Sequence, residues 1–204
     1  MNQRPELTPR TPTPEQSEGP YYLDLDLVRS DIRENRPGVP LRLAVITTTP
    51  DSAPVAGAIV DVWHCDALGV YSWQPGRPKP PAGSQTGAGL ASGTFLRGRQ
   101  RSDERGSCHF QTIYPGWYVG RSVHIHVKVR HAAGMLTTQL YFPEALTDVV
   151  HEQPPYRARS RRDTVNPEDA VFDAVGDATL LDPAPLADGY AGAITLVLAD
   201  PAGC

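Results

Sequence analysis

Two histidines stand two residues apart in the stretch VHIHVKVR, residues 123–130, a spacing suited to binding one metal ion. Side chains of a strand alternate between its two faces, so His124 and His126 project together from one face, while the valines and the isoleucine occupy the other. Two imidazoles on one face lie close enough to share a metal. A pair of hydrogen-bonded histidines without a metal fits these two residues equally well.

The residues that complete the ligand set decide which metal such a site prefers. Zinc requires a third His, a Cys or a carboxylate, and an iron(II) triad requires a nearby acid. The pair is followed by Lys128 and Arg130. His131 has the wrong parity for the face of the pair, and Asp61 has a suitable facing but no other feature of a ligand. The carboxylate candidates are therefore weak.

Tyrosines offer a different ligand set. Tyr118 stands six residues before His124, just after a Pro-Gly pair that turns the chain, and Tyr71 lies in a Gly-x-Tyr segment beyond the strand that carries Trp63. A phenol, with a pKa of ~10, binds as phenolate only beside a strongly acidic cation such as ferric iron. Two imidazoles, two phenolates and one hydroxide balance the charge of iron(III). Each tyrosine alone reads as a packing residue, but the joint arrangement favours iron.

Short strands separated by turns must position these side chains. The alternation of apolar residues predicts strands over 41–48, 58–65, 94–100, 109–113, 123–130, 137–142 and 194–199. We expect 94–100 and 109–113 to form a hairpin around a turn at 103–106. Helices are expected over 144–151 and from Asn166, where Pro167 takes the first helical position. The pattern is typical of a mainly β domain, a two-sheet β-sandwich with long loops and one or two short helices.

The composition supports this fold class. The chain has 21 Pro and 18 Gly among 204 residues, and proline this frequent breaks helices and central strands. A helical bundle, a coiled coil and a long doubly wound sheet are therefore excluded. Residues 1–20 read as an extended Pro/Thr/Glu-rich arm, 21–204 as a single domain, and 75–93 as a long surface loop that could roof a pocket.

Charge and cysteine content exclude some partners. The net charge of −4 and the pI near 5.8 give no electrostatic reason to expect nucleic acid or an anionic membrane. No apolar run approaches the ~20 residues of a membrane span. Cys65, Cys108 and Cys204 are an odd number without zinc-type spacing, which favours buried or idle thiols over a Cys65–Cys108 bridge. The arginines of 157–162 read as a solvated or ion-paired face rather than a nucleic-acid patch.

Several stretches carry a resemblance to a known family. They are GPYY (19–22), GAIVDVWHCDALGVYSW (57–73), FLRGRQRSDERG (95–106), FQTIYPGWYVGRSVHIHVKV (110–129) and TTQLYF (137–142). The sequence resembles the intradiol ring-cleavage dioxygenases, non-haem iron(III) enzymes that include catechol, protocatechuate and hydroxyquinol dioxygenases. The similarity is spread over about 13–200, and the order Tyr…Tyr…Arg-x-x-His-x-His is specific to the family.

The resemblance implies an activity and a set of site residues. The expected reaction cleaves a catechol-type ring between its two hydroxyl-bearing carbons with both atoms of O2, giving a cis,cis-muconate-type diacid. One Fe(III) per chain would be bound by two tyrosines and two histidines, Arg121 would lie beside the substrate ring, Gln139 near the oxygen pocket, and Tyr21 in the active site. The implied iron ligands are Tyr71, Tyr118, His124 and His126, of which Tyr118 would also take up a substrate proton.

Some expectations stay open at this level. About twenty residues precede GPYY, so we expect the long helical dimerisation segment of catechol dioxygenases to be absent. The motifs WHCDA and TIYPGWY are most similar to those of a compact single-domain branch of the family. A homo-oligomer and the preferred catechol are undecided. The absence of an apolar h-region in 1–13 favours a cytoplasmic location, although some compact relatives are exported. The alternatives are a β-sandwich that binds aromatic or sugar ligands without turnover, and a zinc hydrolase built on His124 and His126.

Overall fold

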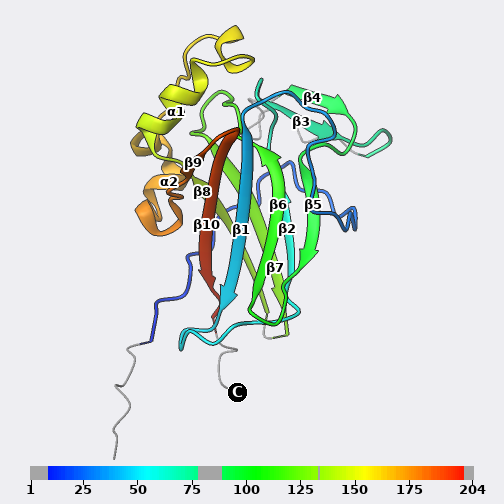
Figure 1. Cartoon of the computed structure of the whole chain (residues 1–204), viewed down its shortest axis with the longest axis vertical. Coiled ribbons are helices and arrows are strands. Elements are labelled where there is room, and N and C mark those ends of the chain that lie inside the picture. The colour runs from blue at the N-terminus through cyan, green and yellow to red at the C-terminus, as the bar shows by residue number, and fades with distance from the viewer. Residues whose placement is uncertain (1–8, 78–88, 133, 200–204) are drawn as a thin grey trace, which may run out of the picture.

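Two four-stranded sheets form the body of the molecule. The computed structural model describes residues 9–77, 89–132 and 134–199. One sheet has the strand order β6-β1-β10-β9 and the other β5-β2-β7-β8, and β3 and β4 form a small sheet of their own. Figure 1 shows the two larger sheets as layers, with α1 and α2 along one side. The expectation of a mainly β two-sheet sandwich with short helices is confirmed.

The bounds of the elements follow. The strands are β1 (Pro40–Thr48), β2 (Ile59–Trp63), β3 (Val70–Trp73), β4 (Gly89–Ser92), β5 (Arg97–Arg101), β6 (Ser107–Ile113), β7 (His124–His131), β8 (Gly134–Tyr141), β9 (Ala184–Leu186) and β10 (Gly189–Val197). The helices are α1 (Glu144–His151), η1 (Tyr156–Ala158), η2 (Asn166–Glu168), α2 (Ala170–Asp173) and η3 (Gly176–Thr179).

The core lies between the two sheets and is built by alternation. Leu41 and Leu43 of β1 and Val60 and Val62 of β2 are buried in one cluster with the apolar residues of β7. Burying each such side chain contributes about 1.5–3 kcal/mol. The polar face of β7 is also buried, because the N-terminal arm covers it. Alternation on β7 is as predicted, and it leaves both histidines on the face away from the core.

The arm is extended and runs along both sheets. The Arg10 N–H donates to Pro50 O at 2.8 Å, Thr13 N–H to Val197 O at 2.9 Å, and Gln16 N–H to Thr137 O at 2.8 Å. The division into an arm over 1–20 and a domain over 21–204 stays a prediction, and residues 1–8 lie outside the described part of the chain.

The expected hairpin of 94–100 and 109–113 is wrong. The strands found there, β5 and β6, belong to different sheets, so the turn between them carries the chain across the sandwich. The Asp103 carboxylate accepts hydrogen bonds from the Arg105 and Ser107 N–H groups and closes the turn. Gly106 O then accepts from Thr47 N–H of β1 at 2.8 Å, which directs β6 to β1 instead of back to β5.

Two other expectations need correction. The end of the presumed loop 75–93 forms β4, which pairs in parallel with β3, while 78–88 lie outside the described residues, so the roofing role is not addressed. The helix from Asn166 is divided into η2 and α2, because Asp169 has an extended ψ of 109° and its side chain caps α2 by accepting from Val171 N–H. The helix over 144–151 is confirmed as α1.

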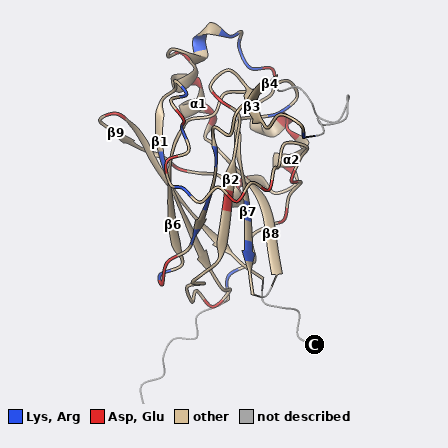
Figure 2. Cartoon of the chain, turned by 90° about the vertical axis from the view of Figure 1, so that its right-hand side faces the viewer, with Lys and Arg blue, Asp and Glu red and all other residues tan. Residues whose placement is uncertain are grey.

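The cysteines, the charged residues and the question of a membrane span can be compared with the structure. Cys65 and Cys108 are buried free thiols, so the alternative of a bridge between them is wrong. Acidic and basic residues are interspersed along the ribbon in Figure 2. Within the described ranges, no helix is both long and apolar enough to cross a membrane.

Candidate metal centre

Four side chains that the sequence singled out lie together on the face of the sheet that the arm covers. His124 Nε2 is 3.1 Å from His126 Nε2 and 3.1 Å from the Tyr118 hydroxyl. The Tyr71 ring centroid lies 5.8 Å from that of Tyr118 and 6.4 Å from that of His126. All four side chains are at most 3% exposed. Two imidazoles and two phenols therefore converge in one buried place.

Two glycines allow the tyrosines to approach. Gly69, at φ +75°, ends the turn before β3, and a Cβ there would lie 2.2 Å from Trp117 O. A Cβ on Gly116 would lie 2.4 Å from Ala67 O. The segments that carry Tyr71 and Tyr118 thus pack backbone against backbone, which only glycine permits.

The histidines are held as neutral ligands. Burial is the largest cause that lowers the pKa of both imidazoles well below 6.5, and the neighbouring Arg121 lowers the pKa of both further. His124 Nδ1 lies 2.7 Å from Ser122 O, so Nδ1 carries the proton and Nε2 presents its lone pair to the site. Neutral imidazole with a free lone pair is the form that binds a metal.

The tyrosines need a cation to ionise. Burial raises the pKa of Tyr71 and of Tyr118 above the ordinary value of 10, and Arg121 acts in the opposite direction on both. The Tyr71 hydroxyl and His126 Nδ1 are buried without a hydrogen-bond partner among the described residues. An unsatisfied buried polar group costs about 1–3 kcal/mol. A strongly acidic metal ion at this place would ionise the phenols and satisfy the Tyr71 oxygen, so the residues fit ferric iron.

Arg121 and Gln139 lie next to the four side chains and contact each other. Arg121 Nη2 donates to Gln139 Oε1 at 2.5 Å, and Gln139 sits opposite His126 in the β7–β8 register. Gln139 Nε2 donates to Ser17 O of the arm at 2.8 Å. The structure therefore brings the two predicted substrate-side residues to the same place, with the Gln139 amide fixed from both sides.

Tyr21 also reaches the site, from the position directly after the arm. Its ring stacks on Tyr71 with centroids 4.2 Å apart and planes 12° apart, and it lies 6.0 Å from Tyr118 edge to face. Gly19, at φ +69°, brings the arm over the His126 ring, where a Cβ would stand 3.4 Å from Cε1. The arm and the Tyr21 ring thus wall the site.

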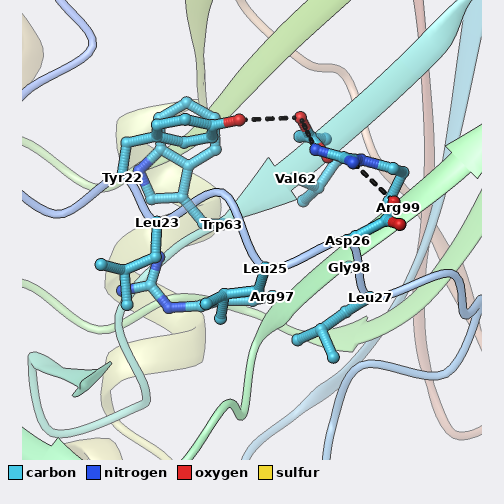
Figure 3. A pocket seen from close by; sticks show the side chains of 11 residues that line it. Tyr22, Leu23, Leu25, Asp26, Leu27, Val62, Trp63, Arg97, Gly98 and Arg99 are labelled. Carbon is cyan, nitrogen blue, oxygen red and sulfur yellow. Dashed lines mark hydrogen bonds and ion pairs between the residues drawn. The ribbon is translucent and has the colours of Figure 1, made fainter. Parts of the chain in front are cut away.

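Asp61, the carboxylate with suitable facing, is engaged elsewhere. Its Oδ1 accepts from Arg99 Nε at 2.6 Å, and its Oδ2 accepts from Arg130 Nη2 at 2.7 Å and from the Tyr22 hydroxyl at 3.1 Å. Figure 3 shows the neighbouring pocket, where Tyr22 lies against Trp63. In the part of the chain that the structure describes, no group of three His, Cys, Asp or Glu side chains could hold a metal.

Sequence reasoning missed three residues around the site. Trp63 stacks on His126 with centroids 4.8 Å apart. Arg97, beside Tyr71, is 3% exposed and donates twice to Ser72, while its Nη1 has no partner among the described residues. Burial lowers the pKa of Arg97 to about 10. The third is Asp169, which pairs with Arg121 at 2.9 Å. Each lies far along the chain from the group that it contacts. Only for Trp63 did the sequence give a signal, because alternation along 58–65 puts it on the same face as Asp61.

Comparison with known proteins agrees with the geometry. A family model described as Dioxygenase matches residues 13–153. An intradiol ring-cleavage dioxygenase from Tetranychus urticae is 31% identical, with a TM-score of 0.82 over 95% of this chain and 96% of that chain. The dioxygenase domain of a dioxygenase carbohydrate-binding protein fusion from Streptomyces sp. SirexAA-E is 31% identical, with a TM-score of 0.68 over 93% and 99%.

Curated relatives match over part of their length. Catechol 1,2-dioxygenase 1 from Acinetobacter lwoffii is 33% identical over 111 residues, 52% of this chain and 32% of that protein. A chlorocatechol 1,2-dioxygenase from Pseudomonas sp. (strain P51) is 31% identical over 136 residues, 61% of this chain and 53% of that protein. The chain thus spans between a third and about half of their length. Fold, site and matches together define its class: the chain belongs to the intradiol ring-cleavage dioxygenase family, which uses non-haem iron.

Proposed function

We propose that this protein is a non-haem iron(III) dioxygenase that cleaves a catechol-type diol between its hydroxyl-bearing carbons and inserts both atoms of O2. The product would be a cis,cis-muconate-type diacid. The observation that carries the proposal is the convergence of Tyr71, Tyr118, His124 and His126 in one buried place. When bound there, ferric iron would supply the Lewis acidity that activates the diol ring toward O2.

The chain's own residues have separate roles in this proposal. Tyr118 can hold the proton that a diol gives up, because burial favours its neutral phenol. Arg121 offers a buried guanidinium to negative charge on the ring, an electrostatic effect of a few kcal/mol, on the order of those measured for oxyanion-hole donors. Gln139 and Tyr21 form walls of the site. One Fe(III) per chain, a small-molecule catechol and O2 are the implied cofactor and substrates.

Oxygen consumption tests the proposal directly. Iron-loaded protein should take up one O2 per catechol, and the product spectrum should be that of a muconate-type diacid and not that of an extradiol product. Parallel assays with protocatechuate, hydroxyquinol and chlorinated catechols would identify the preferred ring. Binding of catechol without oxygen uptake would contradict the proposal and support the alternative of a binding module without turnover.

A further inference from the structure

Asp169 is a buried carboxylate that accepts hydrogen bonds from Arg121 and Ser122, beside the candidate site, and from Val171 N–H of α2. It stands between η2 and α2 and is 2% exposed. Arg121 Nε donates to its Oδ2 at 2.9 Å and to its Oδ1 at 3.2 Å. Ser122 donates to Oδ2 twice, from its N–H and from its hydroxyl, each at 2.9 Å. The carboxylate therefore fixes two consecutive residues just before β7.

The Ser122 contact leads to a metal-binding imidazole. Ser122 O accepts from His124 Nδ1 at 2.7 Å, so the position of this peptide sets which nitrogen of His124 carries the proton and how the ring is turned. Arg121, the other residue held by Asp169, extends Nη2 to Gln139. One carboxylate is thus linked to the substrate-side guanidinium and, through a single peptide, to His124.

We propose that Asp169 is a positioning residue that orients both Arg121 and His124, an inference that rests on the proposed function. Asp169 is separated in the sequence from Ser122 by 47 positions and from Arg121 by 48. Buried partners that orient metal ligands typically change metal affinity or activity 10–100-fold when replaced. Asp169 lies beyond residues 13–153, so the family match does not include it.

The variant Asp169→Asn tests both roles. Asparagine fills the same space and keeps one oxygen for Ser122, but it lacks the charge and has no second oxygen to share the Arg121 Nε–H. The matched control is Asp173→Asn, the same change at an exposed position of α2. We expect Asp169→Asn to lower kcat and to speed iron loss to a chelator by about 10–100-fold each, with Asp173→Asn unchanged.

A double variant shows which contact of Asp169, that with Arg121 or that with Ser122, carries each effect. In the Arg121→Met background, Asp169→Asn should lower kcat by less than about threefold further, because the arginine is already absent, yet it should still accelerate iron release through Ser122 and His124. In iron-free protein, imidazole 15N NMR should show a single His124 tautomer in the wild type and a mixture in Asp169→Asn. This last readout needs neither iron nor catalysis.

The outcomes distinguish this inference from the proposed function. A wild-type protein that takes up no oxygen with any catechol contradicts the proposed function, while the His124 tautomer still tests Asp169. If the wild type is active and Asp169→Asn equals Asp173→Asn in kcat, iron release and His124 tautomer, Asp169 is not a positioning residue. Loss of kcat without a change in the other two readouts also contradicts the role toward His124.

Discussion

At the residue scale, the site is made of groups that satisfy each other only in part. The Tyr71 hydroxyl and His126 Nδ1 have no partner among the described residues, although both are buried. Burial also keeps the imidazoles neutral and the phenols protonated. These conditions suit a strongly charged cation and leave an iron-free site with unsatisfied polar atoms.

Tyr118 and Tyr71 should differ in function. We expect Tyr118→Phe to retain iron on the other three ligands, with a weakened visible band, while kcat falls about 10²–10⁴-fold because the proton-accepting phenol is gone. Steady-state oxygen uptake and the visible spectrum of the same sample check this. Tyr190→Phe, on β10 of the other sheet, is the control. Unchanged kcat in Tyr118→Phe would contradict the proton-accepting role.

At the element scale, the sequence predicted local features well. The alternation on β7 placed His124 and His126 on one face, and α1 has the bounds expected. The partner of each strand was harder to predict, because β6 pairs antiparallel with β1, which lies far from it in sequence. Asp169 was missed for the same reason. An acidic residue near the start of a helix gives no sign in the sequence of a partner at Arg121.

The turn before β3 should be sensitive to substitution. Gly69→Ala places a Cβ 2.2 Å from Trp117 O at a φ of +75°, so we expect a loss of about 3 kcal/mol in the free energy of unfolding. Gly76→Ala, at φ +85° with nothing within 4 Å, should cost only about 1 kcal/mol. Denaturant unfolding compares them. Equal losses would show that the Gly69–Trp117 contact is unimportant.

At the scale of the whole molecule, the fold buries an imidazole that must stay neutral. His64 is fully buried between Cys65 O and the Thr112 hydroxyl, each 2.7 Å from a ring nitrogen. Burial lowers the pKa of His64 to about 4 from 6.5. The unfolded chain therefore binds a proton near pH 6.5 that the folded chain refuses until about pH 4.

The free energy of unfolding should consequently decrease as the pH is lowered. Above pH about 6.5 the titration of His64 does not change the free energy of unfolding. As the pH falls from there to about 4, it lowers the free energy of unfolding by about 3 kcal/mol. Denaturant unfolding of iron-free protein across this range measures the loss. In His64→Asn the decline should be smaller by about that amount. Parallel curves for the two proteins would contradict a buried neutral His64.

The visible spectrum of the iron-loaded protein tests the central claim most directly. If Tyr71, Tyr118, His124 and His126 bind ferric iron, the protein should show a tyrosinate-to-iron charge-transfer band. That band should be lost in Tyr71→Phe and kept in Tyr190→Phe, with iron content measured in each sample. A protein that stays colourless after iron loading, or a band that persists unchanged in Tyr71→Phe, would contradict this account.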